Sequence, residues 1–246
     1  ANPMFRHHRR IYEWKYKGRM RRMMSEHGIR ATGSKKGKVR EYAEAFGVAL
    51  VIALIVRTLF LQAFKIPSGS MENTLLVGDH IFVNKFIYGY HVPYTKGRIL
   101  AFTTPKRGDI VVFVFPEDPS KDFIKRVIGT PGDVVEIRQK TVYINGAPLV
   151  EEYTRFADGK NSDGGVIRGR DNMPPVRVPA GKLFMMGDNR DRSYDSRFWG
   201  FVDMDAVIGR ALFLYFSIDW NRGIGWTDVG RYPELVRWDR IGRVLH

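Results

Sequence analysis

The chain has 246 residues, a net charge of +14 and no cysteine. This length suffices for one good-sized domain without disulfide bonds, and the lack of cysteine excludes thiol catalysis and zinc–thiolate sites. The charge alone is typical of a nucleic-acid-binding protein. However, residues 1–40 hold 13 Lys or Arg against two acids, whereas residues 41–246 hold 27 basic and 24 acidic residues. We therefore expect a basic leader on a nearly neutral domain, and no nucleic-acid partner.

The leader, residues 1–42, mixes Lys and Arg with aromatic residues and methionines. Such a mixture is typical of a short helix lying in a membrane interface, and equally of an irregular basic tail. Residues 28–38 are rich in Gly and Lys and are expected to form a linker.

An apolar run at 43–64 predicts a transmembrane helix, because 22 residues at helical rise span roughly 33 Å. Arg57 costs about 2.5–3.5 kcal/mol on insertion, but twelve Leu, Ile, Val or Phe residues in 45–64 each contribute about −0.3 to −0.6 kcal/mol. Positive flanks stay in the cytoplasm and attract anionic lipid. We therefore expect a single span in the plasma (inner) membrane, with the leader cytoplasmic and residues 65–246 extracytoplasmic. A buried helix of a soluble protein or a cleaved signal peptide are the alternatives.

Beyond the span the pattern is mainly β. Alternating or continuous apolar runs, separated by Gly, Pro, Asn and Asp, predict strands at 80–86, 110–115, 123–128, 134–138, 142–144, 183–186 and 207–216. The Asn145-Gly146 step predicts a hairpin. Residues 151–179 have little apolar content, so we expect 139–182 to be an inserted hairpin or cap outside the core.

Two residues beyond the span are candidates for catalysis. Ser70, in the segment IPSGSM at 66–71, is a candidate nucleophile. Lys125 alternates with Phe123 and Val127, so all three share one strand face. Burial among apolar groups lowers the pKa of a lysine and makes its amine a usable base. Each signal is weak alone, because loop serines and exposed strand lysines are common.

The segment GDNRDRSYDSRFWG at 187–200 alternates Asp with Arg. This alternation predicts an ion-paired, hydrogen-bonded loop that fixes a neighbouring site. It lacks calcium-loop spacing and its arginines repel a cation, so we expect no metal and no cofactor. The pattern also gives no local support for a Ser-His-Asp triad, since His80 has the setting of an ordinary strand residue.

In order, the chain carries IPSGSM (66–71), TLLVGD (74–79), KRVIG (125–129) with PGD (131–133), the loop 187–200, and DRIGR at 239–243. These ordered segments resemble the conserved boxes of the bacterial type I signal peptidase (leader peptidase) family, over most of residues 50–246. The resemblance implies a β-barrel or sandwich catalytic domain with an N-terminal transmembrane helix. It also implies a serine endopeptidase that cleaves signal peptides from exported preproteins.

The resemblance also implies roles for individual residues. Ser70 matches the nucleophile and Lys125 the general base, while Ser68 and the Ser70 amide form the oxyanion hole. Three further positions match residues that support the site: Ser193, which orients the base, and the polar pair Asp195 and Arg197. Substrates are expected to bind as an added β-strand, with small residues at the first and third positions before the scissile bond.

Two features depart from the family pattern. Well-known Gram-negative members have two spans, so this chain is either a single-span member or lacks an upstream segment. The insert between Lys125 and Gly187 is shorter than in the largest members, so we expect no full second β domain.

Two other functions remain open at this point. A self-cleaving Ser/Lys regulatory protease has the same chemistry, but such proteins carry a DNA-binding head, and here no helix-turn-helix pattern precedes the catalytic residues. A membrane-tethered β module without activity is the non-enzymatic alternative.

Overall fold

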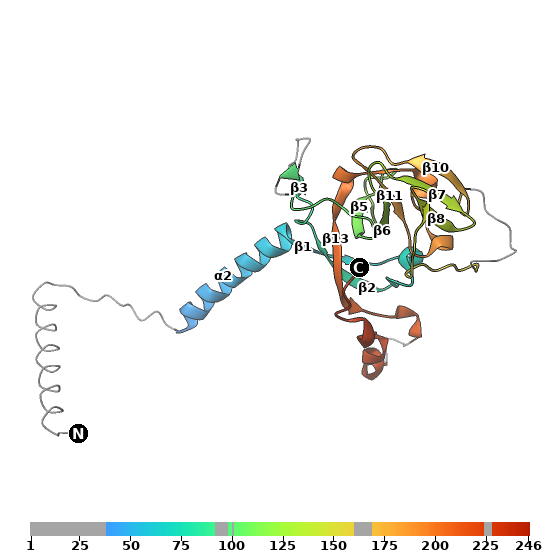
Figure 1. The fold of residues 1–246 in the computed structure, drawn as a ribbon. Helices are drawn as coiled ribbons and strands as arrows, with labels where there is room; N and C mark the ends of the chain where they lie inside the picture. The colour runs from blue at the N-terminus through green and yellow to red at the C-terminus, as the bar shows by residue number, and fades with distance from the viewer. Residues whose placement is uncertain (1–37, 92–97, 100, 160–168, 224–227) are drawn as a thin grey trace, which may run out of the picture. The chain divides into compact units, whose positions relative to one another are not determined.

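A computed structural model describes residues 38–91, 98–99, 101–159, 169–223 and 228–246 (Figure 1). The two interpretations of the basic leader fall on residues 1–37 and so lie outside the described residues. The rest of the chain is mainly β, as predicted.

The first element of the described residues is helix α2, Lys38–Leu59, which has an acidic residue in its first turn and an ion pair between Arg40 and Glu44 at 3.0 Å. Its apolar side chains are exposed wherever they are described, as for Phe46 at 70%. In the part of the chain that the structure describes, no helix combines the length and apolar character that crossing a bilayer requires. The predicted span of 43–64 is also too long at its end, because residues Leu61–Lys65 form a strand.

The larger sheet has seven strands, and every neighbouring pair is antiparallel. In sheet order they are β1 (Leu61–Lys65), β2 (Asp79–Asn84), β13 (Val207–Ser217), β5 (Ile110–Val114), β6 (Asp122–Gly129), β11 (Lys182–Met186) and β12 (Val202–Asp203). The strands predicted from periodicity lie within two residues of these bounds. Strand β1 was missed, because a five-residue segment directly after an apolar helix has no period that separates it from that helix.

A second sheet has four strands in the order β10 (Met173–Arg177), β7 (Val134–Arg138), β8 (Thr141–Ile144) and β9 (Ala147–Pro148). The predicted hairpin is confirmed, since Asn145 and Gly146 have φ of 52° and 83° and connect β8 to β9. A separate pair, β3 (Tyr90–His91) and β4 (Arg98–Ile99), completes the strands of the described residues.

The two larger sheets share one of the three hydrophobic clusters. Phe184 and Met186 of β11 pack with Ile137 of β7, and with Met173 and Val178 from the segment expected to stay outside the core. Figure 1 shows β7, β8 and β10 beside β11. The expectation that 139–182 lies outside the core was therefore wrong for Met173 and Val178, although this segment does contain the predicted hairpin. A few well-spaced apolar residues are enough to cover one face of a sheet whose other face meets water.

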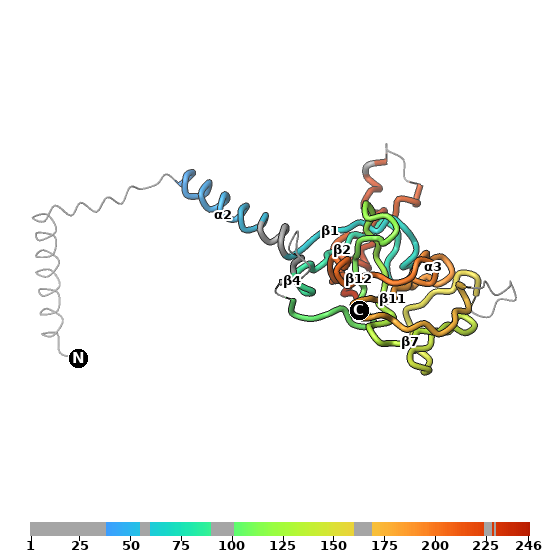
Figure 2. The backbone as a smooth tube through the Cα atoms, turned by 90° about the horizontal axis from the view of Figure 1, so that it is seen from above, coloured from blue at the N-terminus to red at the C-terminus, as the bar shows by residue number. Residues whose placement is uncertain are grey.

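Apart from α2, the described helices are short, with three to seven residues each, in agreement with the absence of a helical period. They are η1 (Gly69–Met71), η2 (Arg190–Arg192), α3 (Ser196–Trp199), η3 (Met204–Ala206), η4 (Trp220–Arg222), η5 (Val229–Leu235) and η6 (Trp238–Arg240). The chain ends beside the larger sheet (Figure 1 and Figure 2), where the carbonyl of His246 accepts a hydrogen bond from Arg126 at 2.6 Å.

Candidate active site

Ser70 lies in the middle of the turn η1, between strands β1 and β2. The turn is anchored by its last residue, Met71, and by Leu75 just after it, which are both fully buried in one hydrophobic cluster. The carbonyl of Ser70 accepts a hydrogen bond from the Asn189 amide at 3.1 Å. Ser70 is thereby held at the surface of the core, with 9% of its area exposed.

Lys125 reaches Ser70 from strand β6, 55 residues further along the chain. Its Nζ lies 2.6 Å from Ser70 Oγ, and Lys125 is only 4% exposed. The ring of Phe123, two residues earlier on the same strand face, lies 5.4 Å from the amine. The two predicted catalytic residues are thus within hydrogen-bond distance of each other.

Burial lowers the pKa of Lys125 to about 8, because the charged amine loses its hydration. The carboxylates of Asp195 and Asp188 act in the opposite direction, and the charge of Arg197 adds to the lowering. About one tenth of the amine is therefore neutral at pH 7, against less than about 0.1% for an ordinary lysine. In that form it can accept the proton of an attacking hydroxyl.

Asp195 and Arg197 form a buried, two-pronged ion pair in the loop 187–200. Arg197 donates Nε and Nη2 to the two carboxylate oxygens at 2.8 and 2.9 Å, and the Gly187 amide donates to the same carboxylate at 3.0 Å. Burial alone raises the pKa of Asp195, but the charge and hydrogen bonds of Arg197 outweigh it and hold that pKa below its ordinary value. The predicted ion-paired loop is confirmed.

Gly187 brings this loop into direct contact with the turn η1, which carries Ser70 and is called the nucleophile turn below. A Cβ at Gly187 would overlap the hydroxyl of Ser193 and the carbonyl oxygen of Ser70. Ser193 is buried, and its hydroxyl contributes to the low pKa of Asp195 without completing a well-formed hydrogen bond. Among the described residues no bond joins Ser193 to Lys125, so its orienting role stays a prediction.

Replacing Gly187 with alanine should therefore disturb the site more than the fold. We expect kcat/KM to fall by about 100-fold, because the added methyl displaces the Ser70 turn by a fraction of an ångström or more. Gly230→Ala is the matched control, since nothing lies within 4 Å of a Cβ there. Kinetics and thermal unfolding of both variants check this. Wild-type kinetics in Gly187→Ala would contradict the contact.

Ser68 stands at the start of the same turn, in extended conformation, with an exposed side chain that does not cap the turn. The Ser70 amide lies in the first turn of η1, where a backbone N–H has no carbonyl partner within the helix. The Ser68 hydroxyl is therefore not used up by a helix-capping bond, and the oxyanion roles of Ser68 and the Ser70 amide stay predictions.

The family model described as signal peptidase, peptidase S26, matches residues 39–216. The chain belongs to this family.

Its relatives include signal peptidase I of Pseudomonas aeruginosa, 35% identical over 241 residues, covering 87% of this chain and 81% of that protein. Signal peptidase I of Rickettsia typhi is 36% identical over 259 residues, covering 87% of this chain and 97% of that protein. The crystal structure of a signal peptidase I from Enterococcus faecalis has 37% sequence identity and a TM-score of 0.36, and covers 44% of this chain and 97% of that chain.

One ion pair of this S26 peptidase site was missed by the sequence reasoning. Arg126 donates Nε and Nη2 to Asp188 at 2.9 and 2.7 Å, and both residues are almost fully buried. Thr74, four residues after Ser70, donates its hydroxyl to the same carboxylate at 2.6 Å. All three residues lie inside the quoted sequence boxes. The strand alternation alone indicates no partner for Arg126.

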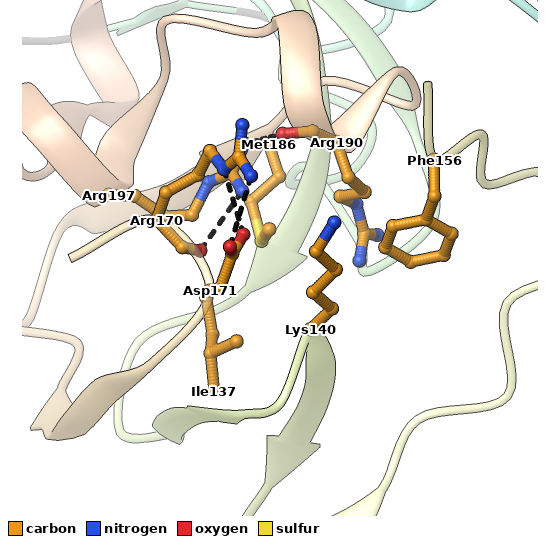
Figure 3. A pocket seen from close by; sticks show the side chains of 8 residues that line it. All are labelled: Ile137, Lys140, Phe156, Arg170, Asp171, Met186, Arg190 and Arg197. Carbon is orange, nitrogen blue, oxygen red and sulfur yellow. Dashed lines mark hydrogen bonds and ion pairs between the residues drawn. The ribbon is translucent and has the colours of Figure 1, made fainter. Parts of the chain in front are cut away.

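A narrow crevice without room for a water molecule lies beside the loop 187–200 (Figure 3). Its lining residues are Ile137, Lys140, Phe156, Arg170, Asp171, Met186, Arg190 and Arg197. The four cations already have carboxylate partners, as Arg170 does in Asp171 at 2.8 Å and Lys140 in Asp191 at 3.1 Å. The crevice is therefore part of the ion-paired scaffold. Within the described residues, no group of three or more His, Asp or Glu is placed to hold a metal ion.

Proposed function

We propose that this family member is a membrane-anchored serine endopeptidase that removes signal peptides from exported preproteins through a Ser70–Lys125 acyl-enzyme mechanism. The observation that carries the proposal is the 2.6 Å contact between two buried groups, Ser70 Oγ and Lys125 Nζ. A nucleophile and a base within hydrogen-bond reach, with the base held partly neutral by burial, are what acyl transfer from a peptide requires.

In the first half of the reaction, neutral Lys125 takes the proton of Ser70 while Oγ attacks the scissile carbonyl carbon. The oxyanion that forms accepts hydrogen bonds from the Ser70 amide and the Ser68 hydroxyl. The Lys125 ammonium then gives its proton to the departing amine, and the C–N bond breaks to leave an ester on Ser70. In the second half, Lys125 deprotonates a water that attacks the ester carbon. The bond from that carbon to Ser70 Oγ then breaks and releases the acid product, while the Lys125 ammonium returns its proton to Oγ.

The loop 187–200 supports this chemistry by position and charge. Asp195 and Arg197 act as a fixed, nearly neutral pair beside the amine, and Ser193 orients it. A charge-compensated pair disturbs the pKa of Lys125 less than either ion alone, since their effects on that pKa are opposite.

The proposed anchor is the apolar run that begins within α2. Its described apolar side chains face outward on all sides, an arrangement that lipid accommodates and water does not. The basic leader before it is attracted to anionic lipid and stays cytoplasmic, which places the catalytic domain outside the membrane. The partners are then membrane lipid and the signal peptides of preproteins.

Reconstituting the full chain in lipid vesicles with a preprotein tests this function. We expect mass spectrometry to find one new N-terminus. The cleaved bond should have alanine at the first and third positions before it. A matched preprotein with leucine at those two positions should remain uncut, because shallow pockets exclude the larger side chain. Cleavage of both preproteins at equal rates, or of neither, would overturn the proposal.

A further inference from the structure

Residues 151–155 form a segment, called the strap here, that lies along the loop 187–200. That loop is called the catalytic loop below. The amide of Arg155 donates to the Asp188 carbonyl at 2.8 Å, and the amide of Arg190 donates back to the Arg155 carbonyl at 2.9 Å. Arg155 thereby forms an isolated parallel β-bridge with Asn189. The strap comes from the polar stretch between the β8–β9 hairpin and β10, outside every sequence box quoted above.

The strap also binds the nucleophile turn. Asn73, three residues after Ser70, donates Nδ2 to the Tyr153 carbonyl at 3.0 Å. Glu72 forms an ion pair with Arg155 at 3.1 Å. Asn73 has φ of 97°, a conformation that favours glycine, so its side chain is held at this contact against a backbone preference.

On the side of the catalytic loop the strap is fixed by a buried ion pair. Glu151 accepts two hydrogen bonds from the Arg190 guanidinium, one of them at 2.7 Å, and both side chains are less than 10% exposed. The Tyr153 hydroxyl donates to the same Glu151 carboxylate at 2.7 Å. Arg190 in turn donates to the Gly187 carbonyl at 3.2 Å, at the contact with Ser70 described above.

The ring of Tyr153 lies over the guanidinium of Arg126, 3.8 Å from ring centroid to the central carbon. Arg126 is the strand neighbour of Lys125 and the ion-pair partner of Asp188, whose charge acts on the Lys125 amine. A ring face at this distance excludes water from the cation and restricts its movement. Tyr153 thus contacts the segment that carries the base and, through its carbonyl, the turn that carries the nucleophile.

We propose that the strap is a positioning element that fixes the Ser70 turn, the catalytic loop and the base-bearing strand relative to one another, with Tyr153 as its central positioning residue. The proposal rests on the Ser70–Lys125 mechanism. Tyr153 does not touch the reacting atoms, and it acts by keeping Ser70 Oγ and Lys125 Nζ in contact. An alternative is that the strap stabilises the fold without affecting this geometry.

Tyr153→Ala tests the proposal in the full chain in vesicles. We expect kcat to fall by about 10- to 100-fold with KM little changed, because a small misplacement of reacting groups affects the chemical step. The negative charge of Asp188 raises the pKa of Lys125. A hydrated Arg126 compensates this charge less well, so the pH at which kcat/KM rises should move upward. Tyr153→Phe keeps the ring and should restore both values.

Tyr143→Ala is the matched control. Tyr143 also lies over an arginine of an arginine–carboxylate pair, Arg138, with 4.7 Å from ring centroid to guanidinium, but in the second sheet. We expect its kinetics and pH profile to equal those of the wild type. If Tyr153→Ala lowers only the melting temperature, with wild-type kcat and pH profile for the folded protein, the strap is structural and the proposal is wrong.

Asn73→Gly provides a second test in case Tyr153→Ala does not fold. Glycine accepts the backbone conformation of Asn73 and removes only the hydrogen bond to the strap, so folding should be retained. We expect kcat to fall by about 2- to 10-fold. An unchanged kcat would overturn the link between strap and nucleophile turn. Ser70→Ala in the same assay separates the two proposals, because activity in that variant removes the proposed mechanism itself.

Discussion

Replacing Lys125 with methionine is expected to reduce kcat/KM by at least about 10⁴-fold while leaving a folded and more stable protein. Methionine has a similar length and no base, so Ser70 keeps its place and loses its proton acceptor. Ser70→Ala should lose as much, because a nucleophile and its base act as a unit. The initial rate of preprotein cleavage in vesicles gives the first quantity, and thermal unfolding gives the second.

The gain in stability follows from the lowered pKa of Lys125. Its pKa is about 8 in the folded protein and about 10.4 in an unfolded chain. Between these values the unfolded chain holds a proton that the folded chain lacks, so the unfolding free energy decreases as the pH falls from about 10.4 to about 8. Below about pH 8, Lys125 is charged in both states, and burial of its ammonium lowers the unfolding free energy by the full amount. Lys125→Met removes this cost, so we expect an increase of about 1–3 kcal/mol at pH 7.

The wild-type enzyme should show the same pKa in its kinetics. Only the neutral amine accepts a proton, so kcat/KM is expected to rise tenfold per pH unit below about 8 and to level off above it. Activity at pH 7 is then about one tenth of the plateau. A flat profile between pH 6 and 9, or a Lys125→Met variant that is both active and less stable, contradicts the assignment of Lys125 as the base.

Replacing Arg197 with alanine is expected to lower the unfolding free energy by about 3–5 kcal/mol, because Asp195 is left buried without its cation. The variant should also need a higher pH for activity. Arg197 lowers the pKa of Lys125 and Asp195 raises it, so losing the arginine leaves the raising effect alone. Chemical denaturation measures the first effect, and the pH profile of kcat/KM in the folded variant measures the second.

Arg138→Ala is the control for this prediction. Glu136 and Arg138 have the same spacing as Asp195 and Arg197 and the same two-pronged geometry, with hydrogen bonds at 2.7 and 2.6 Å, but Arg138 is solvent-exposed and Glu136 is only partly buried. Water screens such a pair, so we expect little change in stability and none in the pH profile. Equal losses in both variants would show that burial of the Asp195–Arg197 pair has no special importance.

Strand positions were the part of the fold that the sequence predicted best. Residues 134–138 form β7 as predicted, because the apolar alternation and the Gly-Asp before it leave one interpretation. The second sheet could not be predicted to the same extent. Met173 and Val178 are too few to give a period, and their burial depends on Phe184 and Met186 from another sheet.

The candidate site also has residues that the sequence predicted and residues that only the structure revealed. Ser70, Lys125, Asp195 and Arg197 were named from the sequence, and the structure brings the first two into contact and pairs the last two. The strap residues Glu151 and Tyr153 were not found, since a polar stretch rich in glycine and aspartate is typical of a surface loop. Their importance rests on partners 39 and 27 positions away, Arg190 and Arg126.

The sequence by itself determined which chemical groups this protein carries, in what order, and which strand face each one shares. Only the tertiary structure decided that Lys125 is buried against Ser70 with a lowered pKa, as a base requires, and is not an exposed strand lysine. Its pKa depends on the loss of water around the amine and on the charges of Asp188, Asp195 and Arg197. Those groups come from a loop more than sixty positions away, and no local pattern of residues sets their distance from the amine.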